Sequence, residues 1–148
     1  MTVRTATCSD YPAICRLMRE DLGVSALIDA EAVERFQRIA GDPNWVVFVA
    51  EADDQTVGFI SAEWRALLHH RPGSYAEIMA LAVSSRHRRT GAGSSLAAAA
   101  EAWARDKGAS ELILHSQMRR EGAHLFYERQ GFEKKSFFFR KILQSEDT

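Results

Sequence analysis

The chain has 148 residues, a length typical of one domain, and 46% of them are hydrophobic, which is enough to form a core. The net charge of −1 at pH 7 argues against a protein drawn to nucleic acid or to an anionic membrane surface. No apolar run is long enough to span a bilayer, and the residues after Met1 show no secretory signal pattern. Cys8 and Cys15 form no CxxC pattern, so we expect no disulfide and no zinc site, and a reducing, cytoplasmic location.

One strand and two helices are expected at the start of the chain. Residues 3–6 favour a short strand. In the helix that follows, Pro12 occupies the first turn, where its missing N–H costs little, and Gly23 ends the helix. A second helix is expected over residues 29–41, because apolar residues recur on one of its faces.

Three strands are expected next. Residues 45–50 form an apolar run rich in β-branched residues, which is typical of a central strand. The polar residues 53–55 predict a turn, and residues 57–64 form the second strand of the resulting hairpin. A proline and a glycine interrupt residues 66–73, which indicates a loop before the next strand at residues 75–83.

The last part of the chain is expected to alternate helices and strands. Helical spacing covers residues 91–107 and again residues 121–130, and each of these helices is followed by a glycine. Short strands are expected at residues 111–115 and 135–142. The whole chain, 1–148, is then one α/β or α+β domain: a mixed central sheet of about six or seven strands flanked by about four helices.

Three consecutive phenylalanines, Phe137, Phe138 and Phe139, lie in the last expected strand. Successive strand residues point to opposite faces, so at least one of these rings points away from the main core. A contact between two copies of the chain, a homodimer, would explain the exposed ring. Packing under a neighbouring helix would explain it equally well.

The segment Arg88-Arg89-Thr90-Gly91-Ala92-Gly93 lies between an expected strand and an expected helix. Its glycines let the backbone approach a ligand closely, and the helix start supplies amide groups with partial positive charge. The arginines add formal charge, so the segment predicts a site for a pyrophosphate-like anion. It is not a Walker loop, and Leu96 occupies the third glycine position of the dinucleotide-binding pattern.

Three segments together resemble the GNAT superfamily of N-acetyltransferases. The Arg-x-x-Gly-x-Gly pattern of residues 88–93 resembles the coenzyme A pyrophosphate loop of that family. Residues 76–83, Ala-Glu-Ile-Met-Ala-Leu-Ala-Val, resemble its central strand. Residues 123–132 resemble its closing motif, in which Phe-Tyr-Glu ends a helix just before Gly-Phe. The resemblance covers nearly the whole chain and implies the GNAT fold, with acetyl-coenzyme A as co-substrate, because the segments occur in the right order.

The resemblance implies that backbone groups hold the cofactor. The strand residues Leu81, Ala82 and Val83 would pair with the pantetheine arm as an added strand would. The pyrophosphate would be bound by the loop residues Arg88, Arg89, Thr90, Gly91, Ala92, Gly93 and Ser94. The family often has Asn where this chain has Arg120, so the contact there is either replaced by a charge-assisted one or lost.

The resemblance also implies three catalytic roles. Glu77 matches a catalytic glutamate and would accept the proton of the attacking amine, directly or through water; a salt-bridged glutamate at a strand start is the alternative. Tyr127 would donate a proton to the leaving thiolate, and core packing is the alternative for it. The Leu81 amide would stabilise the oxyanion.

The acceptor amine is expected near Trp64, His69 and His70, which border the expected amine side of the site. Adjacent histidines make a poor metal pair, so no metal is expected. The side of the site nearest the first helices has carboxylates that could attract a cationic amine. They are Glu20, Asp21, Glu31, Glu34 and Glu63.

The sequence therefore predicts a cytoplasmic, acetyl-coenzyme A-dependent N-acetyltransferase. Its amine would attack the thioester directly in a ternary complex, and the amine would belong to a small molecule or a protein. Two alternatives stay open. One is a non-catalytic acyl-coenzyme A-binding module, which would need neither Glu77 nor Tyr127. The other is a nucleic-acid binder built on its local arginines, against which the net charge argues.

Overall fold

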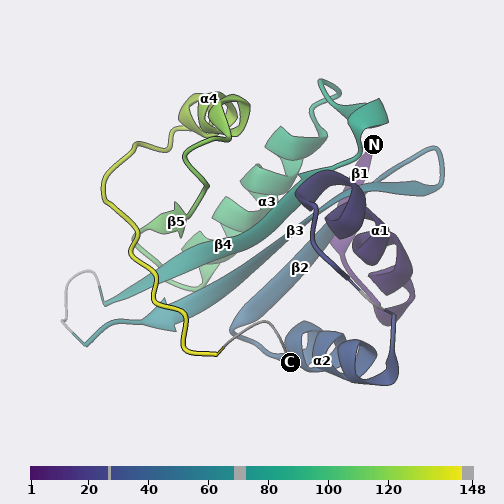
Figure 1. The fold of residues 1–148 in the computed structure, drawn as a ribbon, viewed down its shortest axis with the longest axis horizontal. Coiled ribbons are helices and arrows are strands. Elements are labelled where there is room, and N and C mark those ends of the chain that lie inside the picture. Colours follow the sequence, from purple (N-terminus) through teal and green to yellow (C-terminus); the bar gives the residue numbers. More distant parts are fainter. Residues whose placement is uncertain (27, 69–72, 145–148) are drawn as a thin grey trace. The chain divides into compact units, whose positions relative to one another are not determined.

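In the computed structural model, residues 1–114 are built on a mixed five-stranded sheet (Figure 1). The structure describes residues 1–26, 28–68 and 73–144, and it divides into two units, Met1–Leu114 and His115–Thr148. The strands lie side by side in chain order; β1 to β4 pair antiparallel and β5 pairs parallel with β4. Their bounds are Thr2–Thr5 (β1), Trp45–Ala52 (β2), Gln55–Ala66 (β3), Ser74–Val83 (β4) and Leu112–Leu114 (β5).

Three α-helices pack on this sheet within the first unit. They are α1 (Tyr11–Leu22), α2 (Ala30–Gly41) and α3 (Ala92–Asp106), and two short 3-10 turns, η1 (Cys8–Asp10) and η2 (Ser85–His87), precede α1 and α3. Asp29 caps α2 by accepting a hydrogen bond from the Ala32 amide at 2.8 Å, and α1 ends at Gly23 with a φ of 65°. None of the described helices has the length and apolar character needed to cross a bilayer.

The two faces of the sheet are covered by different helices (Figure 1). Val49 and Phe59 are buried in a cluster with α1 and α2. Their chain neighbours point the opposite way, because strand side chains alternate between faces. A Cβ on Gly58 would lie 3.1 Å from Leu96 Cδ1, which places α3 on that second face. Leu96 and Ala100 are fully buried there.

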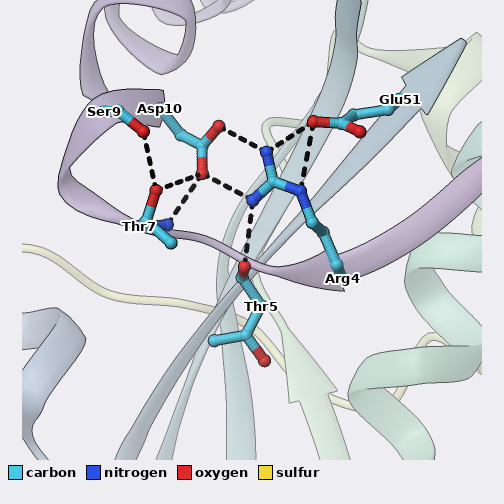
Figure 2. A network of polar contacts seen from close by, with 6 residues as sticks. All are labelled: Arg4, Thr5, Thr7, Ser9, Asp10 and Glu51. Atoms are coloured by element: carbon cyan, nitrogen blue, oxygen red, sulfur yellow. Dashed lines mark hydrogen bonds and ion pairs between the residues drawn. The ribbon is translucent and has the colours of Figure 1, made fainter. Parts of the chain in front are cut away.

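A polar network joins β1 to its surroundings at the edge of the sheet (Figure 2). Two guanidinium nitrogens of Arg4 each donate to Asp10 at 2.8 Å, and Arg4 also donates to Glu51 of β2 at 2.5 and 3.1 Å. The Thr7 amide donates to the Asp10 carboxylate at 2.7 Å. Asp10 is buried, and hydrogen bonding from Arg4 lowers its pKa below the usual aspartate value. The network therefore fixes the entry into α1.

The turn between β2 and β3 forms where the sequence predicts it. Asp53 and Asp54 have φ values of 52° and 60°, the left-handed pair that a tight two-residue hairpin turn requires. The strand expected at 57–64 runs further in both directions, through Ala66. The Leu67 amide donates to the Gly73 carbonyl at 2.8 Å, so the expected loop begins just beyond β3.

The second unit contains the helix α4 (Glu121–Arg129), as expected. The strand expected at 135–142 is wrong: none forms among the described residues of this unit, so the sheet has five strands and not six or seven. Aromatic residues favour strands only where a neighbouring strand offers pairing and packing, and this unit has no other described strand. Phe137, Phe138 and Phe139 are 84%, 65% and 88% exposed.

Candidate active site

The edge of β4 that faces away from β3 is paired with β5 up to Ile78 and, among the described residues, has no pairing with β5 beyond it. Within the described part of the first unit, β5 pairs with β4 only over Ala76–Ile78, whereas β3 accompanies β4 as far as Val83. The register against β3 skips Met79, so β4 bulges where its pairing with β5 stops. In an antiparallel pair, alternate residues direct both backbone polar groups away from the partner strand. The segment that contains Leu81 can therefore accept an extended ligand as an added strand.

The chain after β4 forms a tight turn into α3. Arg89 and Gly91 both have positive φ, 66° and 86°, and the Thr90 hydroxyl donates to the His87 carbonyl at 2.5 Å. The first intrahelical bond of α3 runs from the Ser95 amide to the Gly91 carbonyl at 2.9 Å. The amides of Ala92 and Gly93 precede this bond at the start of the helix, and the helix dipole makes this end positive. The turn can bind an anion through its backbone.

The arginines of this turn differ in their surroundings. The guanidinium of Arg88 contacts the carboxylate of Asp21 in α1, so its charge is already compensated. Arg86 and Arg89 are exposed. Arg86 and Arg16 line a polar hollow of about 490 Å³ beside the turn. Sequence reasoning assigned Asp21 to the attraction of an amine and missed its pairing with the loop, because no local pattern relates residues 67 positions apart.

Glu77 lies in β4 directly opposite Glu63 of β3, and both point to the face of the sheet that carries α1 and α2. Its side chain is 12% exposed. Arg65 bridges the two carboxylates: its Nε lies 2.5 Å from Glu63 Oε1 and its Nη1 lies 3.2 Å from Glu77 Oε1. Hydrogen bonds to Glu63 and Tyr75 raise the pKa of Arg65, so it stays charged. Sequence reasoning missed Arg65, although its two-residue spacing from Glu63 indicates a shared face.

Trp64 points to the opposite face of the sheet from its neighbours Glu63 and Arg65. The Lys107 ammonium, just after α3, lies 5.5 Å from the centre of the Trp64 ring, a cation–π distance. The structure therefore brings Glu63 and Glu77 together but does not bring Trp64 to them. His69 and His70 lie outside the described residues.

Tyr127 and Arg120 belong to the second unit. Tyr127, in α4, is partly buried between the rings of Phe126 and Phe132, with ring centres 5.6 and 6.1 Å away. The backbone of Arg120 caps α4: its carbonyl accepts from the His124 amide at 3.1 Å. Tyr127 thus has a fixed ring and a phenol that can donate a proton.

Among the residues that the structure describes, no group of three or more His, Cys, Asp and Glu side chains could hold a metal ion. Cys8 is exposed and Cys15 is buried, and neither is in a disulfide. The candidate site residues described above offer carboxylates, a phenol, backbone amides and local positive charge.

Two curated relatives match almost the full chain. The aminoalkylphosphonate N-acetyltransferase of Salmonella typhimurium is 34% identical over 95% of this chain and 90% of its own length. The aminoglycoside N(6')-acetyltransferase type 1 of Stenotrophomonas maltophilia is 31% identical over 97% of this chain and 94% of its own length.

A solved structure has the same fold. It is a transcriptional regulator from Bacillus halodurans, which superimposes with a TM-score of 0.88 at 24% identity and covers 96% of this chain and 99% of its own. In addition, the sequence model of the acetyltransferase (GNAT) family matches residues 11–132, which is most of the first unit and the first half of the second. The chain belongs to the GNAT family of acetyltransferases.

Proposed function

We propose that this protein is an N-acetyltransferase that transfers the acetyl group of acetyl-coenzyme A to a primary amine. GNAT proteins use acetyl-coenzyme A as co-substrate. The observation that carries the proposal is the continuity between β4 and the turn after it. The strand leaves β5 at Ile78 and runs on to Val83, and the turn into α3 follows within the same segment. A linear arm that ends in a pyrophosphate matches this order of features.

The backbone of Leu81, Ala82 and Val83 binds the pantetheine arm in this proposal. Amides of the turn bind the pyrophosphate, and exposed Arg89 adds charge. The residues assigned to the pyrophosphate are Arg88, Arg89, Thr90, Gly91, Ala92, Gly93 and Ser94. Arg88 acts here mainly through its pair with Asp21, because that contact already uses its charge.

Glu77 is assigned as the general base. It is a mostly buried carboxylate on a rigid strand, which suits a group that must hold a proton acceptor in a defined direction. It takes the proton of the amine directly or through water as the amine attacks. The Leu81 amide stabilises the negative charge that develops on the carbonyl oxygen.

Tyr127 is assigned as the general acid for the leaving thiolate. This role rests on the match of residues 123–132 to the family motif and on the phenol held by Phe126 and Phe132. Arg120 is assigned a charge-assisted contact to the cofactor in place of the usual Asn. We also propose that both units belong to one domain, because the family match runs through both.

The acceptor is proposed to be the primary amine of a small molecule. The two curated relatives are named for aminoalkylphosphonates and aminoglycosides, which are small amines of opposite overall charge. Glu63, Glu77 and Arg65 together carry one net negative charge, which favours an approaching ammonium group. Contacts from Trp64, His69 and His70 to the acceptor stay predictions. We propose a reducing, cytoplasmic location, which fits two cysteines outside any disulfide.

A thiol-release assay tests the proposal. The purified protein is given acetyl-coenzyme A with aminoalkylphosphonates, aminoglycosides and a lysine peptide in parallel wells. We expect release of free coenzyme A with a small amine, and loss of that release in Glu77→Gln but not in the control Glu101→Gln, whose exposed carboxylate lies on α3. Binding of coenzyme A without release by any amine would favour the non-catalytic acyl-coenzyme A-binding module.

A further inference from the structure

Arg65 connects two carboxylates that face each other across adjacent strands. Glu63 and Glu77 are directly paired in the β3–β4 register. Such partners have Cβ atoms only about 4.5–5.5 Å apart, and like charges there repel. The guanidinium contacts both, at 2.5 Å from Glu63 and 3.2 Å from Glu77. Arg65 thus offsets the repulsion between two mostly buried carboxylates.

The two contacts of Arg65 compete for one charge. A cation beside a carboxylate stabilises its ionised form and weakens it as a proton acceptor. An arginine held by Glu77 alone would therefore oppose the role of a base. Glu63 accepts the shorter of the two contacts, so part of the arginine charge is directed away from Glu77. Arg65 thus contacts Glu77 while Glu63 holds the guanidinium more closely.

We propose that Arg65 is a positioning residue for Glu77, and that Glu63 sets the proton affinity of Glu77 through Arg65. The functional half of this inference rests on the proposed role of Glu77 as general base. It adds two residues from β3 to the machinery of the reaction, neither of which needs to touch the substrate. Tyr75, on the same face of β4, hydrogen bonds to Arg65 and fixes it further.

The elements that contact β4 include β3, β5, α3 and α1. On the β5 side Glu77 pairs with Ile113, whose strand neighbours Leu112 and Leu114 are also apolar. α3 packs on the other face of the sheet. α1 contributes charged residues of its own, of which three have partners elsewhere: Arg16 donates to the Thr56 carbonyl, Arg19 to the Ala26 carbonyl, and Asp21 pairs with Arg88. Glu20 of α1 lines the polar hollow beside the turn.

Titration of the Glu77 carboxyl carbon by NMR tests the linkage without any substrate. Protein labelled with 13C-glutamate is titrated, and the Glu77 signal is assigned as the one missing in Glu77→Gln. Relative to wild type, Arg65→Gln should move the midpoint to higher pH, because a neighbouring cation is lost, and Glu63→Gln should move it to lower pH, because a neighbouring anion is lost. Arg65→Lys keeps the positive charge, so its midpoint should lie much closer to the wild-type value than the midpoint of Arg65→Gln does. The control pair on α3, Arg105→Gln and Glu101→Gln, should leave it unchanged.

The pH dependence of acetyl transfer tests the consequence. The acidic limb of the kcat/KM profile should shift to higher pH in Arg65→Gln and to lower pH in Glu63→Gln. KM for acetyl-coenzyme A should stay within about twofold of wild type in both variants. A residue with only a structural role would lower the rate at all pH values without moving the limb. Where Arg65→Gln fails to fold, Glu63→Gln and Arg65→Lys carry the same comparison.

Different results would overturn the general-base role of Glu77 and its linkage to Arg65 and Glu63. Unchanged activity in Glu77→Gln would overturn the base role, and the NMR titration would still decide the linkage. Loss of activity in Glu77→Gln, with midpoints unmoved in Arg65→Gln and Glu63→Gln, would overturn this inference alone. Midpoints that move in the same direction in both variants would also overturn it.

Discussion

The guanidinium of Arg88 contacts the carboxylate of Asp21, and this ion pair joins the turn after β4 to α1. The Asp21 side chain is only 10% exposed, whereas that of Arg88 is 60% exposed. A carboxylate removed from water needs a partner more than an exposed guanidinium does. The pair therefore anchors the turn and at the same time withholds the charge of Arg88 from a bound anion.

The variants of this pair should act on coenzyme A affinity in opposite directions. Asp21→Asn frees the charge of Arg88 for the pyrophosphate and should tighten binding, whereas Arg88→Gln leaves the Asp21 carboxylate uncompensated beside the turn and should weaken binding of an anion, each by about 3- to 10-fold, as expected for roughly 1 kcal/mol at an exposed site. Calorimetric titration with coenzyme A measures both. Equal weakening in the two variants would mean that Arg88 acts only by anchoring the turn.

Gly58 lies against the strand that we assign to the cofactor. An added Cβ would be 3.0 Å from the Ala82 carbonyl oxygen and 3.1 Å from Leu96 Cδ1. The carbonyl belongs to a paired strand and cannot easily move, so Gly58→Ala should cost about 1–3 kcal/mol of stability and weaken coenzyme A binding as β4 shifts. Denaturant unfolding and coenzyme A titration check this. Gly41→Ala is the matched control, since nothing lies within 4 Å of its added Cβ; equal effects in both variants would refute the account.

The sequence predicted most of the first unit because its patterns are local. The apolar run at 45–50, the two aspartates of the hairpin and the glycine after α1 each depend on a few neighbouring residues. The turn into α3 was predicted for the same reason, since Gly91 adopts the left-handed conformation that its pattern implies.

The remaining features depend on distant partners. The strand expected at 135–142 needs a neighbour that the sequence cannot specify, and three phenylalanines alone do not make one. The contact between copies suggested for these rings stays a prediction. In the same way, neither the pairing of Arg88 with Asp21 nor the bridge from Arg65 to Glu77 has a local signal. The candidate site was therefore predicted as a set of residues, and its electrostatic connections were not.

The Arg4–Asp10 pair should make stability depend on pH in a defined window. The folded-state pKa of Asp10 is lowered, so its contribution is present above the unfolded value of about 4 and is lost as pH falls through the lowered value. Asp10→Asn should therefore cost about 1–2 kcal/mol at pH 7, and the difference from wild type should shrink below about pH 4. Urea unfolding at several pH values measures it. A difference that stays constant down to pH 2 would contradict the assignment.

Tyr127→Phe separates a proton donor from a packed ring. The phenyl ring keeps the contacts to Phe126 and Phe132, so the variant should fold. Loss of the phenol should lower kcat by about 10²-fold, as for other general acids. Steady-state kinetics decide the matter: a wild-type kcat would leave Tyr127 with a packing role only.

A thermal-shift titration with acetyl-coenzyme A, coenzyme A and ATP tests the central claim, that β4 and the turn after it bind the co-substrate. A ligand that binds only the folded state adds about 2.7 kcal/mol of stability at 100 times its Kd. We expect the melting temperature to rise with both coenzyme A species and to stay unchanged with ATP. No rise at saturating acetyl-coenzyme A, or an equal rise with ATP, would contradict the assignment of this segment as a coenzyme A site.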